Sequence, residues 1–202
     1  LLKNADYAMF EAKKQGKSTF EFYTKKLNDV ASQRMAMEKN MRLALDRNEF
    51  LLFFHPRVEL TSQKIVGFEA LIRWQSPESG FVMPNKFLPL AEETILICEI
   101  GNLVFDNVCQ YIKYWIEQGQ PDIRVSINLS KMQIYRGDTY NLIKTYIDLY
   151  GISGKNLEIE VTESGVLKDE EAAIELLIKL KALGITISLA DFGTGYSSLR
   201  FL

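Results

Sequence analysis

The sequence predicts an α/β protein built around a mainly parallel sheet, and three observations support this fold class. Short runs of alternating or continuous apolar residues, typical of strands, recur along the chain. Amphipathic segments of about 10–20 residues, typical of helices, separate most of these runs, and this alternation favours parallel strands joined by right-handed crossovers. Polar residues also follow directly on several predicted strands, as they do where parallel strands end at a functional face.

The first 24 residues form a segment of their own. The apolar spacing in 4–14 predicts a short helix, Gly16 lies where a C-terminal cap is expected, and 20–23 alternate like a strand. One helix and one strand are too little to bury a core, so we interpret this segment as the end of a domain that lies upstream.

A longer helix is predicted over 27–47. Met37, Met41 and Ala44 fall on one face of this helix, and charged residues occupy its other faces. We interpret residues 25–48 as a connection between two modules.

The remaining elements alternate between strands and helices. Strands are predicted at 51–60 and 64–73, and the polar turn between them makes them a hairpin. An amphipathic helix is expected over 97–118, where Gly119 and Pro121 end it. The later strands are expected at 123–129, 157–161 and 185–190, and the later helices at 140–150 and 169–183.

Composition limits the possible functions. The chain has 202 residues, 47% of them hydrophobic and 25% charged, with a formal net charge of −2. This balance argues against a broad interface with a nucleic acid polymer, which needs a positive surface. No apolar run approaches the ~20 residues that span a bilayer. Cys98 and Cys109 lie too far apart on one predicted helix for a disulfide, so we expect reduced thiols in the cytoplasm. The whole protein is then either cytoplasmic, or this chain is the cytoplasmic part of a longer, membrane-anchored protein.

Polar side chains gather where the predicted strands end. Glu69, Asn128, Glu160, Glu163 and Asp191 all lie late in a strand or just after one. Because parallel strands deliver their carboxyl ends to one face, we expect these side chains to converge. Four carboxylates and an amide oxygen suit Mg²⁺ or Mn²⁺, and two such ions can clamp a phosphodiester. The alternative is that each is a solvated loop residue or a helix cap, which is the commoner role of any single glutamate beside a strand end.

Five motifs, taken together, resemble the EAL domain family. They are 69–71 with Arg73 and Trp74, then 84–92, 128–130, 160–164 and 191–198, in the order of that family and at its approximate spacing. The resemblance covers about residue 35 to the end. Residues 4–23 resemble the last helix and strand of a GGDEF domain, a module that often precedes EAL domains.

The resemblance implies a TIM-like (β/α)8 barrel with an irregular first strand. We expect residues 1–24 to be a C-terminal remnant of a GGDEF domain, and 49–202 to be an EAL domain that is incomplete at its C-terminus after about five strands. The implied function is signal transduction through a bacterial second messenger, with metal-dependent hydrolysis of cyclic di-GMP to linear pGpG. The implied partners are cyclic di-GMP, Mg²⁺ or Mn²⁺, a second copy of the chain in a homodimer, and an upstream GGDEF or sensory domain.

The resemblance also implies roles for particular residues. The expected metal ligands are Glu69, Asn128, Glu160 and Asp191. The expected catalytic residues are Glu69, Glu163 and Asp191. The expected substrate-binding residues are Leu71, Arg73 and Asn128.

Three departures from the family pattern leave catalysis open. The chain ends before the strands expected to carry a lysine near the attacking water and a further glutamate. Ala190 stands where the family has an aspartate expected to bridge two metal ions, and it is either natural or engineered. His55 replaces a ligand-contacting glutamine, and we interpret it as a structural side chain at a strand end rather than as a base. The alternatives to a phosphodiesterase are a degenerate EAL domain that binds cyclic di-GMP or a partner protein without catalysis, and a purely structural or dimerising module.

Overall fold

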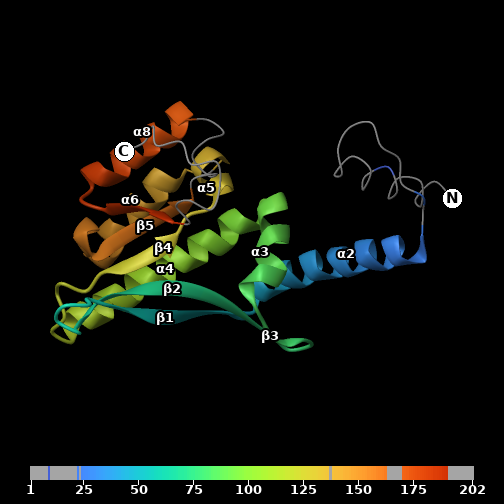
Figure 1. The fold of residues 1–202 in the computed structure, drawn as a ribbon, viewed down its shortest axis with the longest axis horizontal. Helices are drawn as coiled ribbons and strands as arrows, with labels where there is room; N and C mark the ends of the chain where they lie inside the picture. The colour runs from blue at the N-terminus through green and yellow to red at the C-terminus, as the bar shows by residue number, and fades with distance from the viewer. Residues whose placement is uncertain (1–8, 10–21, 23, 137, 163–169, 191–202) are drawn as a thin grey trace. The chain divides into compact units, whose positions relative to one another are not determined.

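The computed structural model describes residues 9, 22, 24–136, 138–162 and 170–190 (Figure 1). The chain divides into two compact units, residues 1–47 and residues 48–202. In the first unit, the predicted helix over 27–47 is confirmed as α2 (Lys25–Asp46). The predicted helix over 4–14 and strand over 20–23 lie outside the described residues, apart from Met9 and Phe22.

The second unit is built on a six-stranded sheet in the described residues. Its strands are β1 (Phe50–Val58), β2 (Ile65–Ser76), β3 (Gly80–Val82), β4 (Val125–Asn128), β5 (Leu157–Thr162) and β6 (Thr186–Ala190). Their order is β1-β2-β4-β5-β6, with β3 paired to β2. Strands β2, β4, β5 and β6 are parallel, whereas β1 and β3 run antiparallel to β2. The predicted α/β class is therefore confirmed, with β1 as the irregular first strand.

Helices connect the parallel strands. They are α3 (Pro84–Glu93), α4 (Leu96–Glu117), α5 (Lys131–Arg136), α6 (Thr139–Tyr150) and α8 (Glu170–Ala182), with a 3-10 turn η1 (Gly154–Asn156) before β5. The sequence predicted α4, α6 and α8 but missed α3, α5 and β3. Short elements give little periodicity, and α3 contains two prolines, of which Pro84 begins the helix, where no amide hydrogen is needed.

One face of the sheet is apolar and packs on the helices. Val125, Ile127, Leu157 and Ile159 are buried on this face. At its edge the rings of Phe54 on β1 and Phe68 on β2 contact Trp115 on α4, with centroids 4.9 and 5.3 Å away. Figure 1 shows α4 running alongside β2 and β4. Because successive strand residues point to opposite faces, the residues between these apolar ones all share the other face.

Candidate functional site

The other face of the sheet is polar. Glu69 on β2 is in register with Ser126 on β4, which is in turn in register with Glu158 on β5. Two residues further along, Asn128 is in register with Glu160, and Glu160 with Ser188 on β6. Backbone pairing therefore places two rows of oxygen-bearing side chains across neighbouring strands, toward their carboxyl ends.

Two predicted site residues are in direct contact. The amide nitrogen Nδ2 of Asn128 donates a 3.0 Å hydrogen bond to Oε1 of Glu69. Glu69 was expected late in its strand, yet β2 continues to Ser76, beyond the predicted end at residue 73. Its register with Ser126, two residues before the end of β4, still brings it to the shared edge. Asn128 closes β4, as predicted.

Arg57 adds a positive charge to this face. Its Nη1 lies 2.8 Å from Oε1 of Glu158 and 3.6 Å from Oε1 of Glu160. The hydrogen bond to Glu158 and the nearby negative charges of Glu160 and Glu69 raise the pKa of the Arg57 guanidinium further above its ordinary value. The described part of the site is thus a cluster of carboxylates that already includes a counter-charge.

Besides Asn128 on β4, the predicted substrate-binding residues lie further along β2. The two strand positions after Glu69 on its own face are Leu71 and Arg73. Arg73 is half-buried, its Nη1 donates to the carbonyl of Ile72 at 2.8 Å, and its Cζ lies 5.6 Å from the ring centre of Phe53. A guanidinium held against an aromatic ring keeps further N–H groups for a phosphate.

Ala190 is the last residue of β6 and pairs with Thr162. By strand alternation its methyl group points to the same face as Ser188 and Glu160. An aspartate at this position would point its carboxylate toward the polar face, whereas the alanine provides no oxygen there.

A cavity of about 400 Å³ opens at the carboxyl ends of β2, β4 and β5. Its polar lining includes Asn128 and Glu160, and Leu71 contributes to its wall. Apolar residues of α4, among them Ile100 and Val104, line another side. This size and mixture of walls are typical of a small-molecule site.

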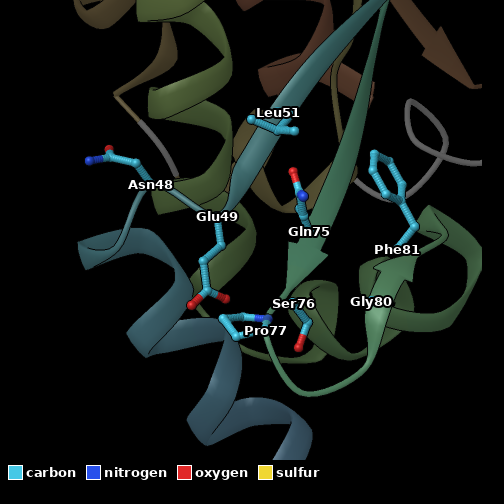
Figure 2. Close-up of a pocket in the computed structure, with 8 residues that line it drawn as sticks. All are labelled: Asn48, Glu49, Leu51, Gln75, Ser76, Pro77, Gly80 and Phe81. Carbon is cyan, nitrogen blue, oxygen red and sulfur yellow. The ribbon is translucent and has the colours of Figure 1, made fainter.

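A second cavity, of about 490 Å³, lies between the start of β1, the end of β2 and β3. Figure 2 shows its lining residues, including Leu51, Gln75 and Phe81. Its one carboxylate, Glu49, accepts a 2.9 Å hydrogen bond from Nε1 of Trp74. This cavity is lined by none of the predicted site residues, whereas Leu71, Asn128 and Glu160 line the 400 Å³ cavity, which is therefore the better candidate.

The described donors suit a hard divalent cation. Glu69, Asn128 and Glu160 supply oxygen ligands of the kind that Mg²⁺ and Mn²⁺ prefer. The hydroxyls of Ser126 and Ser188, on the same face, are buried and find no hydrogen-bond partner among the described residues, so this part of the face has unused hydrogen-bonding capacity. Within residues 24–136, 138–162 and 170–190, no three acidic, histidine or cysteine side chains form a metal-binding group. Glu163 and Asp191 lie outside the described residues.

Sequence reasoning missed two members of the site, Arg57 and Glu158. The strict alternation Leu157-Glu158-Ile159-Glu160-Val161 puts both glutamates on one face, so the signal for Glu158 was present. Nothing local pointed to Arg57, because its partners lie on a strand far along the chain. His55 was expected at a strand end, but it lies inside β1, exposed and directly opposite Glu69.

No described helix is both long and apolar enough to cross a bilayer.

The chain is 37% identical over its whole length to the bifunctional diguanylate cyclase/cyclic di-GMP phosphodiesterase MucR of Pseudomonas aeruginosa, and spans 30% of that protein. It is also 37% identical over its whole length to the signaling protein YkoW of Bacillus subtilis, of which it spans 25%.

The solved structure of the PaMucR phosphodiesterase in complex with c-di-GMP is similar to this fold. The TM-score is 0.77 at 36% identity, over 81% of this chain and 66% of that one. The family model of the EAL domain matches residues 38–202. That match takes in the whole sheet, both rows of polar residues and every predicted site residue. The chain therefore belongs to the EAL domain family.

Proposed function

We propose that this chain is a cyclic di-GMP phosphodiesterase domain that hydrolyses one phosphodiester bond of its substrate to give linear pGpG. The observation that carries the proposal is the arrangement of Glu69, Asn128 and Glu160 on one face of three adjacent parallel strands, where Asn128 donates a hydrogen bond to Glu69 and is in register with Glu160. Oxygen donors on three separate strands, beside an open cavity, suit a phosphodiester-cleaving site better than a set of unrelated surface carboxylates.

Each residue has a proposed role. Glu69, Asn128, Glu160 and Asp191 would hold Mg²⁺ or Mn²⁺, with Glu163 as a further catalytic carboxylate. A divalent ion bound there would neutralise phosphate charge and make water more acidic. Arg73 would hold a phosphate through its guanidinium, with Leu71 beside it against the nucleotide and Asn128 fixing the position of Glu69. The relatives support this substrate, since MucR is a bifunctional diguanylate cyclase/cyclic di-GMP phosphodiesterase and the solved PaMucR structure is a c-di-GMP complex.

The remaining parts of the chain fit a multidomain signalling protein. We propose that residues 1–24 end a GGDEF domain, that 25–48 connect it to the EAL domain, and that the EAL domain forms a homodimer. The alignment with MucR, whose name includes diguanylate cyclase, extends over the first 24 residues and supports the GGDEF assignment. Cys98 and the buried Cys109 are not joined in a disulfide, which supports a reducing cytoplasm.

A second function is favoured by Ala190. A site that lacks one bridging carboxylate should hold a second metal ion poorly while still binding an anionic ligand. The alternative is therefore a receptor that binds cyclic di-GMP, or a partner protein, without cutting it.

The test is linear pGpG formation from cyclic di-GMP with Mg²⁺ or Mn²⁺, measured on the full-length protein and on Ala190→Asp. Ala172→Asp is the matched control, because it adds the same charge at an exposed position of α8. We expect metal-dependent product, with more from Ala190→Asp than from the control. Equal rates in all three proteins would show that Ala190 does not limit turnover. Cyclic di-GMP binding without product from any of them would replace the hydrolase with the receptor.

A further inference from the structure

We infer that Arg57 is a positioning residue of this site, a built-in cation that holds Glu160 and weakens the binding of a divalent metal. The inference rests on the proposed function, because it takes Glu160 as a metal ligand. It concerns a residue on β1 that the expected ligand set does not include.

The geometry makes Arg57 a link between strands that are not neighbours. Arg57 lies on β1, whereas Glu158 and Glu160 lie on β5, with β2 and β4 between them in the sheet. The β2 residue directly opposite Arg57 is Gly67, which presents no side chain, and the β4 residue in register with Glu158 is the small Ser126. Gly67 and Ser126 lie on the strands between Arg57 and Glu158. Because both are small, the long side chain of Arg57 has room to cross the polar face and reach Glu158.

Glu158 explains why a cation is needed here. Its exposed fraction is 4%, and a buried carboxylate is costly unless it is paired. Arg57 meets that need at 2.8 Å. The pair also anchors the guanidinium, although the Arg57 side chain remains 43% exposed.

The same guanidinium then acts on Glu160. Once Glu158 fixes Nη1, the 3.6 Å approach to Oε1 of Glu160 holds that carboxylate on the face where Asn128 is its register neighbour. The fixed positive charge reduces repulsion among Glu69, Glu158 and Glu160 before any metal binds. It also competes with a metal ion for the same carboxylate and repels it.

The consequence can be measured as a dissociation constant for Mn²⁺ alone. Isothermal titration calorimetry on the full-length protein would compare wild type with Arg57→Met, Arg57→Lys and the double variant Arg57→Met/Glu158→Gln. Arg57→Met removes the competing charge, so we expect Mn²⁺ to bind roughly three- to tenfold more tightly. Arg57→Lys keeps the charge and should bind as wild type does. The double variant removes one charge of each sign, so its affinity should return close to that of wild type.

Thermal unfolding without metal supplies the structural control. Arg57→Met should unfold at a lower temperature than wild type, because Glu158 is left unpaired, and the double variant should recover most of the loss. Lower stability with unchanged Mn²⁺ affinity in Arg57→Met would overturn the inference and leave Arg57 as a purely structural partner of Glu158. If Arg57→Met does not fold, an affinity for the double variant that differs from wild type by tenfold or more would also overturn it.

These outcomes separate the inference from the proposed function. A shift in Mn²⁺ affinity without pGpG formation in any variant would support the role of Arg57 and contradict the hydrolase. Normal pGpG formation with unchanged Mn²⁺ affinity in Arg57→Met would support the hydrolase and contradict the role of Arg57.

Discussion

Nδ2 of Asn128 and Oε1 of Glu69 lie 3.0 Å apart, although 59 residues separate them in the sequence. The contact joins the closing residue of β4 to a residue inside β2, and it exists because the two strands are parallel neighbours. An amide that donates to a carboxylate also orients that carboxylate's remaining lone pairs. The pair is therefore the best-defined part of the candidate site.

Replacing Glu69 by glutamine should abolish the proposed activity while preserving the fold. Glutamine keeps an oxygen that can accept the hydrogen bond from Asn128, but it removes the negative charge that a metal ligand needs. We expect pGpG formation to fall by on the order of 100-fold or more, measured with saturating Mg²⁺ or Mn²⁺. Glu175→Gln on α8 is the matched control, because Glu175 is exposed and pairs only with the surface residue Lys179 among the described contacts. Turnover within about twofold of the control would remove Glu69 from the site.

Gly154 should not tolerate a side chain, because a Cβ atom in place of its Cα hydrogen would point at the backbone of Leu183. A Cβ atom there would overlap the backbone carbonyl of Leu183, at the end of α8. Backbone cannot swing aside as a flexible side chain can, so Gly154→Ala should lower the free energy of unfolding by about 2–3 kcal/mol. The measurement is chemical denaturation followed by circular dichroism.

Gly151 provides the comparison for this prediction. It is also a glycine, with φ of 63°, but nothing lies within 4 Å of a Cβ placed there. Asparagine tolerates this left-handed conformation, so Gly151→Asn should cost less than about 1 kcal/mol. Equal losses in the two variants would mean that the approach of Leu183 to Gly154 does not limit stability.

Tyr150 should make stability depend on alkaline pH. Its hydroxyl donates a 2.6 Å hydrogen bond to Oδ1 of Asp106 on α4, and this bond, with burial, raises the pKa of Tyr150 to about 12. Only the protonated phenol can donate this bond. Its contribution is therefore complete below the ordinary tyrosine pKa near 10 and is lost as the pH rises toward 12.

Tyr150→Phe should accordingly lower the free energy of unfolding by about 1 kcal/mol at neutral pH, and the difference from wild type should shrink between about pH 10 and 12. Tyr114→Phe on the exposed side of α4 is the control, with no expected change. A difference that stays constant up to pH 12 would show that the bond to Asp106 is not the cause.

Much of the fold could be predicted from local patterns. The hairpin of β1 and β2, the helices α4, α6 and α8, and the strands β4 to β6 all have enough residues for a clear periodicity. The short elements α3, α5 and β3 could not be predicted in this way, because they depend on contacts with longer elements rather than on their own repeat. Among them, α5 is placed by Gln133, whose Oε1 accepts from the amide and hydroxyl of Ser130, and whose side chain lies against Gly101 of α4.

The sequence by itself determined the fold class and the family, and it predicted Glu69, Asn128 and Glu160 as site residues, because residue type and spacing carry that information along the chain. Only the tertiary structure decided how these residues combine. Strand register places Glu69 beside Asn128, turns the methyl group of Ala190 toward the polar face and lets Arg57 reach Glu158 and Glu160 across two strands. These contacts depend on which strands pair and on which side chains between them are small, and neither is encoded near the residues that meet.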